Sequence, residues 1–161
     1  MNCTLELVVQ VAIEAPELPC EEKLQSWVEA ALEGAGFEGE AEVVVRLVNE
    51  AESAALNEAY RHKQGPTNVL SFPFQIPEGV EEEIHLLGDV VICAPVVMAE
   101  AAVQHKALEA HWAHMVVHGV LHLLGYDHHE EDQAMAMEDL ETRIITDLGF
   151  ARPYGEVAES L

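Results

Sequence analysis

Hydrophobic and polar residues alternate along several short stretches of the chain, and apolar residues recur at helical spacing along others. Alternation among β-branched residues predicts strands, and apolar residues at i, i+3 and i+4 predict amphipathic helices. The predicted strands are Leu5–Ile13, Glu42–Val48, Val69–Phe74 and Asp89–Cys93. The predicted helices are Glu21–Leu32, Glu50–His62, Pro95–His105, Leu108–Leu124 and Glu130–Leu148. Pro73 indicates that the third strand is an edge strand or is irregular, because proline lacks a backbone donor.

Strands occupy the first half of the chain and helices the second, which predicts an α+β fold. We expect a small mixed sheet of about four strands with about five to six helices. A length of 161 residues is typical of one domain, so 1–161 is predicted to form a single domain with a frayed tail at 152–161. The nearly continuous apolar character of Leu108–Leu124 predicts that this helix packs centrally.

Three histidines in and after this central helix have the spacing of metal ligands. His118 and His122 are four residues apart, so both lie on one helix face about 6 Å apart along the axis. Gly125 can adopt the left-handed conformation that ends a helix, and the returning chain can then bring His128 to the same ion. Three histidine nitrogens and one open position are typical of a catalytic zinc site, so the helix is predicted to be zincin-like.

Two further histidines lie upstream on the same helix. His111, His114, His118 and His122 all fall within one arc of the helix surface, so spacing alone also allows His114 and His118 as the ligand pair. The pair His118 and His122 is favoured because only this pair is followed by a turn that can return a third ligand. We expect His111 and His114 to line the site or to contact a ligand.

The histidine spacing is also similar to the metzincin protease signature H-E-x-x-H-x-x-G-x-x-H. A metalloprotease needs the glutamate of that signature as its general base. Gly119 stands at the corresponding position and has no side chain to remove a proton. The ligand spacing is therefore kept without the peptidase base, which argues against a protease or amidase.

The balance of charge is strongly acidic. Seven Lys and Arg residues against 30 Asp and Glu residues give a formal net charge of −23, which repels nucleic acids and anionic membranes at long range. An anionic substrate would therefore need a local cationic patch, and Arg61, His62 and Lys63 form the only basic cluster. They could complement a helix dipole, but we favour Arg61 as a phosphate clamp. Three neutral residues that follow could add hydrogen bonds: Thr67, Asn68 and Ser71.

Asp127 precedes the third histidine of the motif and has three possible roles. It could accept the second N–H of a ligating imidazole, or it could act as a general base. It could instead cap the next helix, with Glu130 in the first turn of that helix. The sequence leaves these alternatives open. His129, directly after the motif, is expected to point away from the site.

The cysteines indicate a reducing compartment. Cys3, Cys20 and Cys93 are odd in number and form no C-x-x-C pair, so they are predicted to be free thiols in a cytoplasmic protein. The first residues are acidic rather than basic, so we expect no signal peptide. No apolar run reaches about 18 residues, so we expect no membrane span.

Four segments, in this order, resemble the YbeY family, the bacterial endoribonuclease and rRNA maturation factor. They are Leu56–Arg61, Pro66–Pro73, Leu87–Ile92 and His114–His128, and the last of them is the most specific. The resemblance extends over nearly the whole chain. Family members often carry aspartate where Asn68 stands, so this chain lacks a carboxylate at that position.

The resemblance implies a zinc-dependent, single-strand-specific endoribonuclease that acts in 16S rRNA 3′-end maturation and ribosome quality control. It also implies that His118, His122 and His128 hold the zinc, that Arg61 is the functional arginine, and that the small ribosomal subunit and an Era-type GTPase are partners. Asp127 and His114 are both candidates for the proton acceptor. The alternative is a ribosome assembly factor without nuclease activity, in which the zinc is structural and the acidic surface binds basic ribosomal proteins.

Overall fold

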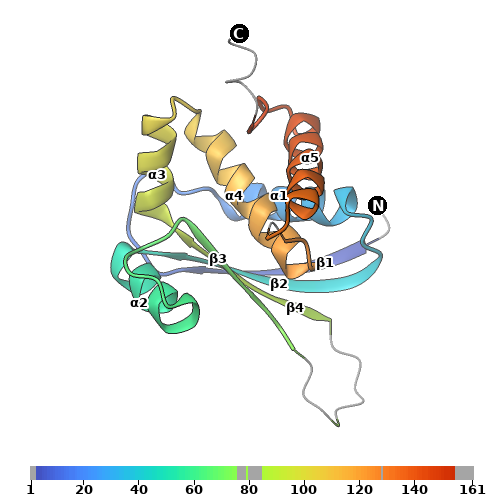
Figure 1. Ribbon diagram of the computed structural model, residues 1–161, viewed down its shortest axis with the longest axis horizontal. Helices are drawn as coiled ribbons and strands as arrows, with labels where there is room; N and C mark the ends of the chain where they lie inside the picture. The colour runs from blue at the N-terminus through green and yellow to red at the C-terminus, as the bar shows by residue number, and fades with distance from the viewer. Residues whose placement is uncertain (1–2, 76–78, 80–84, 128, 155–161) are drawn as a thin grey trace.

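The computed structural model describes residues 3–75, 79, 85–127 and 129–154 (Figure 1). Every predicted strand and helix is present, and each boundary lies within three residues of the prediction. In chain order the elements are β1 (Cys3–Val11), α1 (Glu21–Gly34), β2 (Gly39–Val48), α2 (Glu50–Arg61), β3 (Val69–Pro73), β4 (Leu86–Cys93), α3 (Ala94–Val103), α4 (Leu108–Leu123) and α5 (Glu131–Asp147). Of the tail predicted for 152–161, only 152–154 lie in the described part.

The strands form one mixed sheet in the order β1-β2-β4-β3. β1, β2 and β4 are parallel to one another, and β3 pairs antiparallel with β4. β3 is an edge strand, and Pro73 pairs with Gly88 at its end, which confirms the interpretation of this proline. The α+β fold with a small mixed sheet is therefore confirmed.

The main hydrophobic core lies between one face of the sheet and the helices α1, α4 and α5 (Figure 1). A smaller cluster on the other face, built around Leu70 and Val91, packs against Leu56 of α2. α4 contacts α1, α3, α5, β3 and β4, and most of its side chains are buried. The predicted central position of this helix is confirmed.

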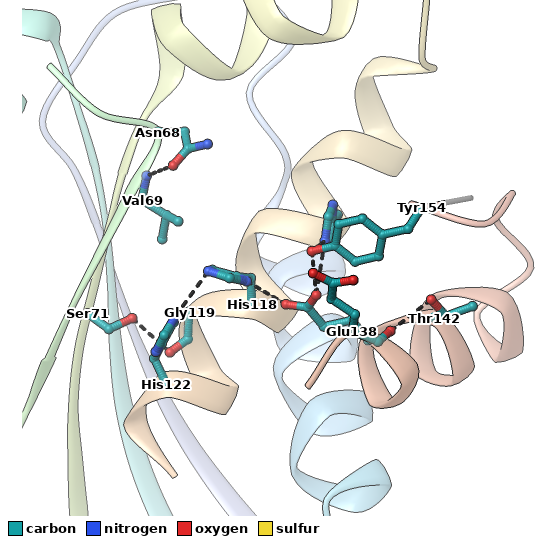
Figure 2. A network of polar contacts seen from close by, with 11 residues as sticks. Asn68, Val69, Ser71, His118, Gly119, His122, Glu138, Thr142 and Tyr154 are labelled. Atoms are coloured by element: carbon teal, nitrogen blue, oxygen red, sulfur yellow. Dashed lines mark hydrogen bonds and ion pairs between the residues drawn. The ribbon is translucent and has the colours of Figure 1, made fainter. Parts of the chain in front are cut away.

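Gly119 brings α4 unusually close to the sheet. A Cβ atom at this position would lie 2.5 Å from Val90 Cγ1 and 3.2 Å from Val69 Cγ2. The Ser71 hydroxyl on β3 donates a hydrogen bond of 2.8 Å to the carbonyl oxygen of Gly119 (Figure 2). The glycine thus fixes the distance between the sheet and the helix turn that carries His118 and His122. The position has no room for the glutamate of a metzincin.

In the described ranges, no helix is long and apolar enough to cross a membrane. α4 has a strongly apolar sequence, but it has 16 residues, four of which are histidines.

Candidate metal centre

His118 and His122 face each other on successive turns of α4 (Figure 2). Their Nε2 atoms are 3.1 Å apart, and their ring centroids are 4.6 Å apart. Two nitrogens that bind one zinc ion at about 2.0–2.1 Å with tetrahedral angles are about 3.4 Å apart. The two imidazoles are therefore close to the separation that a shared metal ion requires.

α4 ends directly after these histidines, as predicted. Gly125 has φ of +100°, and the amide of Tyr126 donates to the carbonyl oxygen of Leu121 at 3.0 Å, which closes the last turn. His128 lies outside the described residues. Among the residues that the structure describes, no group of three His, Cys, Asp or Glu side chains is arranged to hold a metal ion. The ligand set of His118, His122 and His128 stays a prediction.

Glu141 of α5 fixes the orientation of the His118 ring. Its carboxylate is fully buried, and its Oε2 atom is 2.5 Å from His118 Nδ1. Because a carboxylate only accepts, this contact assigns the proton of His118 to Nδ1 and leaves the lone pair on Nε2. A carboxylate behind the distal nitrogen of an imidazole is typical of histidines that bind metals, because it fixes both the tautomer and the ring orientation.

Tyr154 and His114 complete the hydrogen bonding of Glu141. The Tyr154 hydroxyl donates to Glu141 Oε1 at 2.5 Å, and it lies 3.1 Å from His114 Nε2, which therefore donates to it. Burial raises the pKa of Glu141, but hydrogen bonds from His114 and His118 outweigh burial and hold the pKa at about 2. Burial and the neighbouring carboxylate raise the pKa of Tyr154, so the hydroxyl keeps its proton. Glu141 is therefore a buried carboxylate with a donor on each oxygen.

A cleft of about 700 Å³ opens in front of the two histidines. It brings together four of the predicted site residues: Arg61, His118, His122 and Asp127. The cleft is also lined by all three neutral residues that were predicted to contact the substrate, namely Thr67, Asn68 and Ser71. Its walls come from the end of α2, from β3 and from the turn after α4.

His114 does not line this cleft. It is 5% exposed, and together with His111 it lines a separate cavity of about 460 Å³. Its ring centroid lies 6.3 Å from that of His118, farther than the 4.6 Å between His118 and His122. His111 Nε2 is 2.9 Å from Glu100 Oε1, and burial lowers the pKa of His111. Both upstream histidines thus contact buried or half-buried partners behind the candidate metal centre, and His114 reaches His118 through Glu141.

Arg61 is available for an anion in the cleft. It lies in the last turn of α2, which ends where His62 adopts a left-handed conformation with φ of 58°. Four of the seven basic side chains of the chain bind acidic side chains or backbone carbonyl groups elsewhere: Lys23, Arg46, Lys106 and Arg143. Arg61 has no hydrogen bond or ion pair within the described ranges. The position of Arg61 near the C-terminal end of α2 also suits the helix dipole, and Arg61 lines the cleft.

The capping role considered for Asp127 is wrong. α5 begins at Glu131 with Glu130, not Asp127, at the N-cap, and the Glu130 side chain makes no capping hydrogen bond. Asp127 instead lines the cleft, and its Oδ2 atom is 3.4 Å from His129 Nε2. The expectation that His129 points away is also wrong, because His129 lines the cleft too. The turn after α4 thus contributes a carboxylate and an imidazole to the site.

The contacts of the Asn68 side chain explain why asparagine, rather than aspartate, stands at this position. Its Nδ2 atom donates to both carboxylate oxygens of Glu100 at 3.2 Å, and its Oδ1 accepts from the backbone amide of Val69 at 2.6 Å. An aspartate at this position would set a second carboxylate against Glu100. Asparagine is therefore the side chain that fits this chain, and no acidic role at position 68 is needed.

Sequence reasoning missed Glu141 and Tyr154. A signal for Glu141 was available, because it falls on the apolar face of the last helix, between Leu140 and Ile144. A carboxylate at a core position of a helix is rare unless it has partners. Tyr154 offered no such signal, because it follows the helix in a short segment without periodicity.

The chain is similar to a known protein family and to a solved structure. The family described as Endoribonuclease YbeY matches residues 9–149. The solution structure of TM1509 from Thermotoga maritima matches with a TM-score of 0.57 and 26% sequence identity, over 95% of this chain and 93% of that chain. The family match covers the candidate metal centre and the cleft, and it ends before Tyr154.

Proposed function

The chain belongs to the YbeY family of endoribonucleases, which process rRNA, and on that premise we propose that it is a zinc-dependent endoribonuclease that cleaves single-stranded RNA. One observation carries the proposal. The Nε2 atoms of His118 and His122 lie 3.1 Å apart at the wall of a cleft that Arg61 also lines. A metal site beside a guanidinium suits a phosphodiester, which carries a negative charge at the bond to be cleaved.

His118, His122 and His128 would hold the zinc. Glu141 supports this set, because it keeps the proton on His118 Nδ1 and turns the Nε2 lone pair towards His122. Zinc, when bound, supplies Lewis acidity towards a phosphoryl oxygen.

Arg61 would bind the scissile phosphate through its planar fork of N–H donors and neutralise the charge that develops during cleavage. Asp127 is the better placed of the two proton acceptors, because it lines the cleft, whereas His114 is buried behind Glu141. Thr67 and Ser71 add hydroxyl groups to the wall. However, the Ser71 hydroxyl donates to Gly119, so it can only accept from a substrate.

The biological setting is also part of the proposal. We assign the activity to 16S rRNA 3′-end maturation and ribosome quality control in the cytoplasm, with the small ribosomal subunit and an Era-type GTPase as partners. A net charge of −23 opposes the binding of free RNA and favours contact with basic ribosomal proteins. The same charge supports the alternative, an assembly factor without nuclease activity.

The test is metal content together with cleavage of a single-stranded RNA, for wild type and two variants. His118→Ala should lose both stoichiometric zinc and cleavage. His85→Ala is the matched control, because it removes an imidazole that pairs with Glu40 and does not line the cleft. Residual cleavage that is equal in wild type and His118→Ala would come from a contaminating nuclease, and the assembly-factor function would then replace the proposal.

The reaction products distinguish two routes of cleavage. A 5′-phosphate or 3′-phosphate without a cyclic precursor indicates attack by water, and a 2′,3′-cyclic phosphate indicates attack by the RNA 2′-hydroxyl. Arg61→Ala should slow cleavage by either route about 100-fold or more, as expected for loss of a preorganised donor to developing charge. Cleavage at the wild-type rate would exclude the clamp.

A further inference from the structure

Tyr60 is an aromatic side chain in an unexpected environment. The helical pattern of α2 places Leu56 and Tyr60 on one face, but only Leu56 packs against the core. Tyr60 is 66% exposed, more than any other Phe, Trp or Tyr in the described ranges, and it lines the cleft with His118 and His122. A large exposed ring within a functional cleft indicates a binding surface.

The ring of Tyr60 is held in place. It makes an edge-to-face contact with Phe72 of β3, with ring centroids 5.1 Å apart and an interplanar angle of 69°. Such a contact restrains the ring while most of the side chain stays exposed. A planar surface is therefore available before any ligand arrives.

The helix end that carries Tyr60 is also fixed. The buried Ser53 hydroxyl donates to the carbonyl oxygen of Thr67 at 2.9 Å and accepts from the Thr67 amide at 3.0 Å. The buried Asn57 side chain donates to the carbonyl oxygen of Gly65 at 2.9 Å. These bonds tie α2 to the loop before β3, so the two walls of the cleft hold a constant distance. A ligand that binds here loses less free energy to ordering of the protein.

The neighbours of Tyr60 match a nucleotide. Arg61 follows directly and can bind a phosphate, while Thr67 offers a hydroxyl group on the same wall. A base can stack on an exposed aromatic ring only when its own faces are uncovered, as in single-stranded RNA. We propose that Tyr60 is the stacking platform for an unpaired base next to the scissile phosphate, and that this platform makes the cleft selective for single strands. The inference rests on the proposed function and adds the subsite that recognises the base.

The first test compares substitutions of Tyr60. Tyr60→Ala should raise KM for a single-stranded RNA about 5- to 150-fold, the range that base stacking on an aromatic side chain provides, with little change in kcat. Tyr60→Phe keeps the ring and should stay within about twofold of wild type. Phe74→Ala is the matched control, because Phe74 is 40% exposed beyond the end of β3 and does not line the cleft.

An abasic scan then identifies the base. In one RNA of defined sequence, each position is replaced in turn by an abasic nucleotide, and Kd is measured by fluorescence anisotropy with zinc removed by a chelator. Wild type should bind more weakly when the abasic nucleotide stands at one position near the cleavage site. Tyr60→Ala should bind that abasic RNA and the intact RNA with equal affinity. The proposal would be overturned if, at every position, the loss of RNA affinity from the abasic nucleotide multiplied with the loss from Tyr60→Ala. It would also be overturned if Tyr60→Ala and Tyr60→Phe lost equal affinity.

The two proposals fail in different ways. If zinc-loaded wild type cleaves no RNA, the nuclease function fails, whereas the anisotropy scan still tests stacking. If wild type cleaves single strands and Tyr60→Ala matches it in both KM and Kd, stacking fails and the nuclease function stands. Melting temperatures within a few degrees of wild type confirm that each variant is folded.

Discussion

Replacing Gly119 with alanine tests whether the close approach of α4 to the sheet positions the candidate metal centre. The new Cβ atom would lie 2.5 Å from Val90 Cγ1, 3.2 Å from Val69 Cγ2 and 3.3 Å from Ser71 Oγ. Carbon atoms in ordinary contact are about 3.5–4.0 Å apart, so the helix or Val90 must move by about 1 Å. Val90 is fully buried and β-branched, so its methyl group has little freedom to turn away.

Two effects of opposite sign decide how Gly119→Ala changes the free energy of unfolding. Alanine in a helix interior is more favourable than glycine by about 1 kcal/mol. An extra methyl group in a close-packed core costs about 1–3 kcal/mol. We therefore expect Gly119→Ala to be destabilised by up to about 2 kcal/mol, because the clash involves two strands at once. Any outward shift of α4 also moves both histidines, so zinc affinity should fall.

Urea denaturation in the presence of a chelator measures the free energy of unfolding of the metal-free protein, so that a change in zinc affinity does not contribute. The matched variant is Val90→Ala, which removes the methyl group that the new Cβ meets. In a double-mutant cycle, Gly119→Ala and Val90→Ala should together cost at least about 1 kcal/mol less than the sum of the single changes. An additive cycle, or a Gly119→Ala protein that is more stable than wild type, would refute the view that this contact fixes the helix.

Three further predictions concern the candidate metal centre and the sheet. Glu141→Gln should weaken zinc binding about 10- to 100-fold, because the amide no longer fixes the proton of His118 on Nδ1; zinc titration and ¹⁵N chemical shifts of the imidazole measure both effects. Asp139→Asn, which removes an exposed charge from the same helix, should bind zinc like wild type. Removal of zinc by a chelator should lower Tm by roughly 5 to 11 °C relative to protein with free zinc at 100 times Kd, which corresponds to about 2.7 kcal/mol. Burial raises the pKa of Asp89, so its ionised form reduces stability above the unfolded pKa of about 3.9, and this loss disappears as pH falls below that value. Asp89→Asn should therefore be more stable than wild type at pH 7, and the difference measured by thermal denaturation should shrink towards pH 4.

The order of elements could be predicted from the sequence because periodicity and local signals agree along most of the chain. The alternation in Glu42–Val48 and the helical spacing in Glu21–Leu32 each correspond to one buried face in the structure. Gly125 was also predictable, because a helix that must return a ligand needs a left-handed residue at its end. These features depend on near neighbours in the chain, which sequence patterns describe well.

The rest of the site depends on contacts between distant parts of the chain. Glu141 meets His118 across two helices, and Tyr154 reaches Glu141 from the segment after α5. The role of Asp127 was open because the same residue could start a helix or line a cleft, and only the position of α5 decides between them. The exposure of Tyr60 could not be predicted for a related reason. Helical spacing suggests that Tyr60 lies on a buried face of α2, but this face is exposed at the end of the helix.

The acidic character of the chain and an RNA substrate can be reconciled through the cleft. Many nucleic-acid-binding proteins gain affinity because their lysine and arginine side chains displace counterions from the phosphate backbone, and such binding weakens steeply with salt. In this chain four of the seven basic residues are bound elsewhere, while Arg61 lines the cleft. Under the two proposals, affinity for RNA would come mainly from Tyr60, the candidate metal centre and short polar contacts. We therefore expect the cleft to bind free RNA weakly at any salt concentration and to recognise an unpaired strand that a larger assembly presents to it.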